Sequence, residues 1–220
     1  VPTRKEGTQA WILPLEGGEP TQLTKFAMGV ADAMWTSDGK HIVFSSEVFP
    51  ECGADDNCNK KNEESMSTGP IQAHMADRLL YRHWTTWKDG KRSHAFLYDT
   101  ETKKYSDLSP GDFDAPVFSI GGGGVAVSPD GKEVCYPSNH DTNEAETTNA
   151  DLYIVSTSGG DAKNITAANK AHDGDPSYSP DGKYIAYRTQ TIPAYESDRF
   201  RIALYDRKTG EKTVLTEECD

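Results

Sequence analysis

The sequence lacks the features that define several protein classes. No run approaches the 18 consecutive apolar residues that a membrane-spanning helix needs. Lys and Arg number 23 against 35 Asp and Glu, so the chain has no excess of positive charge for binding nucleic-acid phosphates. Its 19 Gly and 12 Pro are near average, which excludes collagen-like and low-complexity character. These 220 residues therefore predict a globular chain that binds neither nucleic acid nor membrane.

Cysteine is also scarce. Four cysteines are too few for a disulfide scaffold, but Cys52 and Cys58 bracket a short polar loop that a bridge between them would tie down. A free pair and a metal site are the alternatives. A zinc site needs four ligands, and no further His or Cys pair lies nearby at the usual spacing. We expect no metal and no cofactor.

A bridge would place the chain in an oxidising compartment, and we expect a periplasmic or secreted location. Residues 1–6 are not those of a signal peptide, so any export signal is either absent or upstream of Val1.

A hairpin repeat is the strongest signal in the sequence. Each copy has a strand, a turn of the type Ser-Pro-Asp-Gly-Lys and a second strand. In such a turn Pro presets one dihedral angle, Asp supplies a side-chain acceptor, and Gly adopts positive φ at little cost. The three copies cover residues 35–44, 127–136 and 178–187.

A second hairpin alternates with the first and occurs four times, starting at Ala10, His94, Asp151 and Arg201. The two hairpins together make four antiparallel strands, which is one blade of a β-propeller. The expected fold is all-β, a partial propeller of about three and a half blades. Half a blade falls at 1–27, and blades at about 28–111, 112–173 and 174–220. Because propellers usually have four to eight blades, we expect a part of one propeller domain from a longer protein.

One blade carries a long insertion. Asp130 and Asp181 of two successive turns are 51 residues apart, whereas Asp38 and Asp130 are 92 apart. The excess of roughly forty residues falls between about 46 and 92, a segment that we call the arm. Long insertions of this kind are either tolerated surface excursions or functional loops. The arm is rich in Trp, His and Arg, and this composition favours a functional loop over a surface excursion.

The arm also carries a family resemblance. Its segments 47–52 and 82–94, Glu-Val-Phe-Pro-Glu-Cys and Arg-His-Trp-Thr-Thr-Trp-Lys-Asp-Gly-Lys-Arg-Ser-His, resemble dipeptidyl peptidase V-type enzymes of the prolyl oligopeptidase family. The resemblance implies a propeller that caps a C-terminal α/β-hydrolase domain with a Ser-Asp-His triad. No Ser in these 220 residues stands in a Gly-x-Ser-x-Gly nucleophile elbow. The hydrolase domain is therefore absent from this chain, which we expect to be non-catalytic by itself.

In such enzymes the propeller would control the access of peptide substrates, and the arm would help to position the substrate's free amino terminus. A carboxylate recognises an ammonium group, and an aromatic face can assist through cation–π attraction. The candidates are Glu47 and Glu51 as the acids and Trp84 as the aromatic ring.

Simpler interpretations stand beside these. Glu47 and Glu51 would be solvated charges that flank a bridge, Trp84 and Trp87 would pack between blades, and Arg82 and Arg92 would pair with acids at the base of the arm.

Two other functions have the same architecture. One is a non-enzymatic periplasmic binding propeller resembling TolB, although its blades would be more evenly spaced than these. The other is an acylaminoacyl-type peptidase, which needs no free amino terminus.

Overall fold

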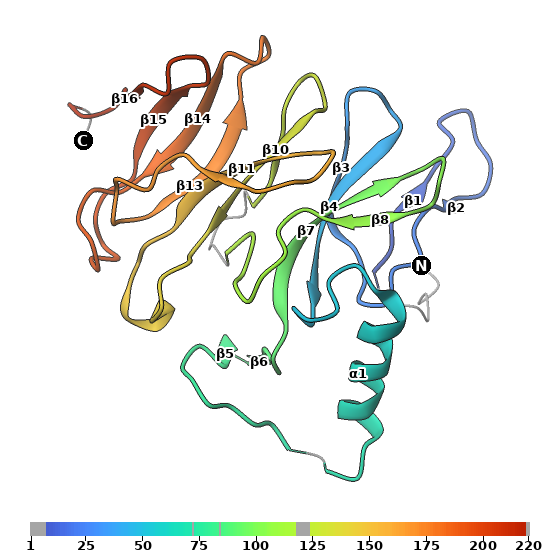
Figure 1. The fold of residues 1–220 in the computed structure, drawn as a ribbon. Coiled ribbons are helices and arrows are strands. Elements are labelled where there is room, and N and C mark those ends of the chain that lie inside the picture. Colours follow the sequence, from blue (N-terminus) through green and yellow to red (C-terminus); the bar gives the residue numbers. More distant parts are fainter. Residues whose placement is uncertain (1–7, 72, 84, 118–123, 219–220) are drawn as a thin grey trace.

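The computed structural model describes residues 8–71, 73–83, 85–117 and 124–218. It contains three four-stranded antiparallel sheets, one preceding hairpin, β1–β2, and a two-stranded pair, β5–β6, in the arm. The hairpin and the three four-stranded sheets lie side by side in an arc (Figure 1). The bounds of the strands are β1 Trp11–Ile12, β2 Thr21–Gln22, β3 Ala31–Trp35, β4 His41–Val48, β5 Arg82–His83, β6 Thr86–Trp87, β7 Arg92–Asp99, β8 Tyr105–Asp107, β9 Ala126–Val127, β10 Glu133–Ser138, β11 Asp151–Ser156, β12 Lys163–Asn164, β13 Asp173–Tyr178, β14 Tyr184–Thr189, β15 Arg201–Asp206 and β16 Lys212–Val214.

Each four-stranded sheet is a simple meander. The orders are β3-β4-β7-β8, β9-β10-β11-β12 and β13-β14-β15-β16, so neighbours in the sequence are neighbours in space apart from the arm between β4 and β7. This is the topology of propeller blades, and it confirms the predicted all-β partial propeller. The helical elements of the described residues, α1 (Asp56–Thr68) and the short η1 (Glu144–Glu146), were not predicted.

The Asp-Gly turns have the same geometry in all three sheets. In the second sheet the Ser128 hydroxyl donates to Oδ1 of Asp130 at 2.7 Å, and the same oxygen accepts the Lys132 backbone N–H at 3.2 Å. Gly131 has a φ of +70°, which suits glycine. The other two turns repeat these bonds around Asp38 and Asp181. Hydrogen bonds that favour the carboxylate lower the pKa of both Asp38 and Asp181 to about 2.

A second repeated bond closes the outer edge of each blade. A Ser or Thr hydroxyl after the last strand accepts a backbone N–H from the third strand or, in the opening hairpin, from Ala10 directly before β1. The donor and acceptor pairs are Ala10 with Thr24, Ala95 with Ser109, Leu152 with Thr166, and Ile202 with Thr216, each at 2.8 or 2.9 Å.

The hydrophobic core lies between the sheets rather than within any one of them. The first cluster joins the opening hairpin to the β3–β8 sheet, and at its centre the ring of Phe26 lies 5.7 Å from that of Phe44 and 5.0 Å from that of Phe96. The second joins that sheet to the β9–β12 sheet around Tyr136. The third joins the last two sheets, and the free thiol of Cys135 is buried there. Each blade is therefore stabilised mainly by its neighbours.

Polar groups are also buried at the seam between the last two sheets. Asp173 is 1% exposed, and its Oδ1 accepts from the side-chain amide of Asn169 at 3.0 Å. Its Oδ2 is buried and has no partner among the described residues. Burial, which disfavours the charged form, raises the pKa of Asp173 to about 6.

Candidate functional site

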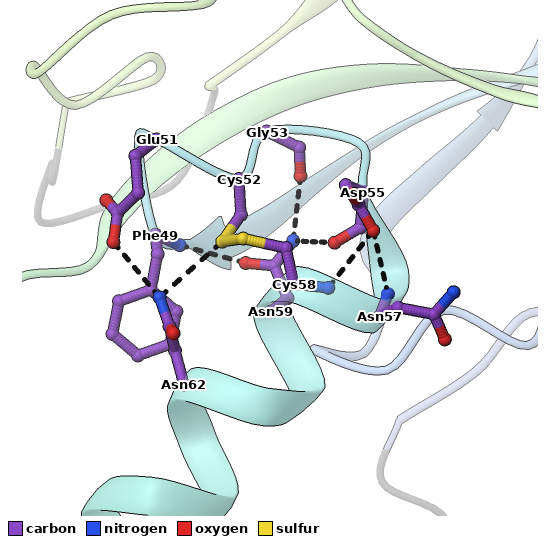
Figure 2. Close-up of a disulfide and its surroundings, with 9 residues drawn as sticks. All are labelled: Phe49, Glu51, Cys52, Gly53, Asp55, Asn57, Cys58, Asn59 and Asn62. Carbon is purple, nitrogen blue, oxygen red and sulfur yellow. Dashed lines mark hydrogen bonds between the residues drawn. A yellow bond between two sulfur atoms is a disulfide. The ribbon is translucent and has the colours of Figure 1, made fainter.

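The arm leaves β4 through a tightly bonded loop that leads into α1 (Figure 2). Cys52 and Cys58 form the predicted disulfide. Asp55 caps the helix, because its carboxylate accepts the backbone N–H groups of Asn57 and Cys58, each at 3.0 Å. The segment is therefore the start of a helix, and not only the short polar loop that the sequence predicted.

A buried asparagine binds this helix start to the end of β4. The Asn59 side chain is fully buried and makes three hydrogen bonds (Figure 2). Its Oδ1 accepts the Phe49 backbone N–H at 3.0 Å, and its Nδ2 donates to the carbonyls of Gly53 at 2.8 Å and Asp55 at 3.0 Å. The disulfide and Asn59 together fix the direction in which α1 leaves the blade.

The two predicted acids lie in different surroundings. Glu47 is exposed near the end of β4, opposite Ser93 of β7, and lines an open cavity of about 360 Å³ with Met28 and Ser93. Its carboxylate has no bonding partner among the described residues. Glu51 is also exposed, but its Oε1 accepts from Nδ2 of Asn62 at 3.0 Å (Figure 2). Trp84, the third candidate, lies outside the described residues.

The far end of the arm is anchored by a buried arginine. Arg92 is 5% exposed, and its guanidinium lies among three carboxylates. Nε is 2.9 Å from Asp112 Oδ1, and Nη1 is 2.8 Å from Glu144 Oε1 and 3.4 Å from Asp114 Oδ2. Burial opposes the charge on Arg92, but the hydrogen bonds to Asp112 and Glu144 outweigh it and raise the pKa of Arg92. This confirms that Arg92 pairs with acids at the base of the arm.

Two other basic residues of the arm reach the same acids. Arg78 Nη2 lies 2.6 Å from Asp112 Oδ2, and Lys88 binds Asp114. Burial of the Asp112 carboxyl is outweighed by its bonds to Arg78 and Arg92, so the pKa of Asp112 is lowered. The acids come from residues 112–114 and from η1 in the β10–β11 connection. The arm is therefore bound to the next blade by charge.

Trp87 packs within the arm, so the alternative that it packs between blades is wrong. The His74 ring is stacked on Trp87 at 4.2 Å with 4° between the planes, and Tyr81 lies at 5.7 Å. His74 Nδ1 is 2.6 Å from Asp89 Oδ1. Arg82, expected to pair with acids, has its guanidinium carbon 5.6 Å from the Trp87 ring centroid.

Beside the Arg92 anchor lies a larger cavity of about 550 Å³. The imidazole of His140 forms part of its wall, 3.7 Å from the Phe113 ring and 4.3 Å from the Tyr153 ring. Burial lowers the pKa of His140 and favours the neutral ring. Leu79 of the arm and the connection 139–146 complete the wall. The arm and the next blade thus line one open cavity.

Within the part of the chain that the structure describes, no group of three or more His, Cys, Asp or Glu residues could hold a metal ion. None of the described helices is long and apolar enough to span a membrane.

Sequence reasoning missed most of the anchor. Asp112, Asp114 and Glu144 were not selected, because acids in polar segments are usually solvated. The one signal available was the pattern Asp-Phe-Asp at 112–114, with one acid on each side of an aromatic residue directly after a blade.

The fold and the arm define the chain as a β-propeller domain with an anchored insertion in one blade. Residues 53–194 match the family described as the dipeptidyl peptidase IV (DPP IV) N-terminal region. The match covers more than half of the chain, and the chain belongs to this family.

Two relatives carry the resemblance to dipeptidyl peptidase V-type enzymes. The chain is 31% identical over 201 residues to Dipeptidyl-peptidase 5 of Porphyromonas endodontalis, a match that covers 88% of this chain and 28% of that protein. It is 28% identical over 204 residues to Dipeptidyl-peptidase 5 of Porphyromonas gingivalis, covering 87% and 28%. The chain thus spans little more than a quarter of these relatives.

Two solved structures share the fold. Acylaminoacyl peptidase of Pyrococcus horikoshii aligns with a TM-score of 0.63 at 14% identity, covering 96% of this chain and 29% of that chain. TolB of Acinetobacter baumannii aligns with a TM-score of 0.52 at 18% identity, covering 93% and 36%. At these identities the likeness supports the propeller and no particular activity.

Proposed function

We propose that this chain is the non-catalytic propeller portion of an exported serine dipeptidyl peptidase. It controls the access of peptides to a C-terminal α/β-hydrolase domain that carries the Ser-Asp-His triad, and its arm helps to position the substrate's free amino terminus. The observation that carries this proposal is the family match over residues 53–194, which includes most of the arm. The length of the relatives is consistent with a further catalytic domain.

Glu47 is the first candidate for binding the substrate ammonium. Its carboxylate is exposed beside an open cavity and is not engaged by another described residue, whereas that of Glu51 already accepts a bond from Asn62. A carboxylate that pairs with an ammonium forms a charge-assisted hydrogen bond, which is stronger than a neutral one. Trp84 remains the proposed aromatic partner.

The test is Glu47→Gln in the full-length enzyme, with Glu51→Gln as the matched variant. The substitution keeps the shape of the side chain and removes the charge. For peptides with a free amino terminus we expect the KM of Glu47→Gln to rise about tenfold, which corresponds to about 1.4 kcal/mol. For the same peptides with an acetylated amino terminus, the KM should not change.

The outcomes show which acid, if either, binds the substrate ammonium. An unchanged KM for free peptides would remove Glu47 from the role, and a rise confined to Glu51→Gln would transfer the role to Glu51. If neither variant changes KM, the arm does not position the amino terminus through these acids.

A non-enzymatic binding propeller is the second candidate, favoured by the alignment with TolB. It predicts that the full-length protein releases no dipeptides and has no Gly-x-Ser-x-Gly elbow after Asp220.

A further inference from the structure

Two buried carboxylates lie at the seam between the last two sheets. Asp151 is the first residue of β11 and is 5% exposed, and Asp173 is the first residue of β13 and is 1% exposed. The residues before them, Ala150 and His172, form a parallel bridge, and the Asp173 backbone N–H donates to the Ala150 carbonyl at 2.8 Å. Because side chains alternate along extended chains, the residues that follow a bridged pair point to the same face. The two carboxylates therefore face the same part of the seam.

Neither carboxylate has a cation to balance it. In the described part of the chain, no Lys, Arg or His forms an ion pair with Asp151 or Asp173. Asp151 accepts from Nδ2 of Asn164 at 2.9 Å and from the Thr166 hydroxyl at 3.3 Å. The bond that Asp173 accepts comes from the neutral amide of Asn169, at 3.0 Å. A buried carboxylate is costly unless it is paired or binds a metal, so two of them together favour a bound cation.

Two buried oxygens at this place also lack a hydrogen-bond partner. Oδ2 of Asp173 and Oδ1 of Asn149 accept no bond from any described residue. Asn149 is 4% exposed and precedes Asp151 by two positions, which puts both side chains on the same face of the chain. The buried side chains of Thr166 and Thr189 add hydroxyl oxygens, and Thr189 is the register partner of Asp173. The seam thus collects carboxylate, amide and hydroxyl oxygens.

We propose that this seam binds one calcium ion through the carboxylates of Asp151 and Asp173 and the amide oxygen of Asn149. Calcium binds oxygen ligands of these kinds in flexible geometry, and its charge balances two carboxylates. Magnesium fits less well, because it keeps several waters and is seldom enclosed by protein oxygens alone. The site has two acids rather than three, and it would replace our expectation that the chain binds no metal. It does not depend on the proposed function.

The ion would join two blades. Asn149, Asp151 and Thr166 belong to the blade of β9–β12, whereas Asp173 and Thr189 belong to that of β13–β16. β11 and β13 lie next to each other at this seam (Figure 1). A ligand that binds only the folded protein stabilises it by mass action, so calcium should raise the unfolding temperature. The pKa of about 6 at Asp173 is that of the seam without an ion.

The test adds calcium chloride at neutral pH to the full-length protein after removal of metals with EGTA. Calorimetry should give a Kd below about 1 mM, as in extracellular calcium modules. The unfolding temperature should rise with calcium and not with the same concentration of magnesium. Asp173→Asn keeps the shape of the side chain, removes one charge and should weaken binding at least tenfold. If the protein binds more than one calcium, this variant should remove one of them.

The matched control is Asp130→Asn, which lies in the sheet of Asp151 but in its exposed Asp-Gly turn and should change the Kd less than twofold. Asn149→Ala separates a ligand from a structural role. Because the amide oxygen of Asn149 has no partner among the described residues, this variant should unfold like the wild type in EGTA. In calcium it should bind at least fivefold more weakly.

Two results would overturn the site. One is a wild type that binds no calcium even at about 10 mM, beyond the range of known protein calcium modules. The other is a Kd that is the same in the wild type, Asp173→Asn and Asn149→Ala. If Asp173→Asn does not fold, the comparison of Asn149→Ala with Asp130→Asn decides. Equal stabilisation by magnesium would also contradict the site, because it would show binding of divalent ions in general.

Discussion

Arg92 and Glu144 join the arm to the neighbouring blade across 52 positions of sequence, with Nη1 of the arginine 2.8 Å from Oε1 of the glutamate. Arg92 opens β7, and Glu144 lies in η1 between β10 and β11. The same guanidinium also holds Asp112. One buried cation therefore fixes the end of the arm and the edge of the next blade at once.

Replacing Arg92 should lower the free energy of unfolding. In Arg92→Met the carboxylates of Glu144 and Asp114 lose a buried partner, and breaking a buried network in this way costs about 3 kcal/mol of unfolding free energy. Arg78→Ala is the control, because its pair with Asp112 is exposed and should contribute less than about 1 kcal/mol. Urea denaturation measures both. Equal losses in the two variants would show that the network is not the anchor.

Alanine substitutions at two equivalent glycines should reveal the contact between successive Asp-Gly turns. Gly39 and Gly131 have φ values of +67° and +70°, but a Cβ on Gly39 would meet nothing within 4 Å. A Cβ on Gly131 would lie 3.2 Å from Ser37 Oγ and 3.4 Å from Thr36 Cβ of the preceding blade.

We expect Gly39→Ala to cost about 1 kcal/mol from its backbone conformation alone. Gly131→Ala should cost about 2 kcal/mol, because the neighbouring turn must also move. Thermal unfolding of the two variants gives the comparison. If Gly39→Ala is the more destabilising, the turns do not support one another.

Asp173 should make the stability depend on pH. Its folded pKa of about 6 lies above the ordinary 3.8, so the folded state binds the proton more tightly than the unfolded state. The stabilisation is complete below pH 3.8 and is lost as the pH rises through 6, by at most about 3 kcal/mol.

Asp173→Asn cannot lose a proton. The unfolding free energy of the variant should therefore increase relative to that of the wild type as the pH rises from 4 to 7. Denaturation at a series of pH values measures it, and a difference that stays constant over this range would contradict the assigned cause.

The disulfide should stabilise the start of the arm. Replacing both Cys52 and Cys58 by Ser removes a cross-link that closes a short loop, at a cost of about 2 kcal/mol on the chain-entropy account. A reductant should lower the unfolding temperature of the wild type as much as the double substitution does, and should leave that of the double variant unchanged. An equal effect of reductant on both proteins would assign the sensitivity to other thiols.

The blades could be predicted from sequence because their signals are local. In Ser128-Pro129-Asp130-Gly131 the hydroxyl, the carboxylate and the positive φ all act within four residues, so the turn forms in any context that supplies two strands. The disulfide was predicted for the same reason, since its cysteines are six positions apart.

The helix of the arm gave no comparable signal. Residues 56–68 contain a single large apolar residue, Met66, so no apolar face recurs with the period of a helix. What stabilises α1 is tertiary: the disulfide, the Asn59 bonds to the end of β4, and the ion pair of Glu63 with Lys91 at 3.1 Å. A propensity argument on the segment alone could not include these contacts.

The sequence by itself determined the repeating hairpins, the all-β propeller, the position of the arm and the bridge at its root, because each depends on residues close together in the chain. Only the tertiary structure decided which acids Arg92 binds, that Trp87 packs inside the arm, and that Glu47 lies beside a cavity with no bonding partner among the described residues. The partners of Arg92 depend on which blades lie next to one another, and the packing of Trp87 depends on how the arm folds back on itself. An ion pair across 52 residues forms only after the hydrophobic seams between the sheets have brought its two groups together.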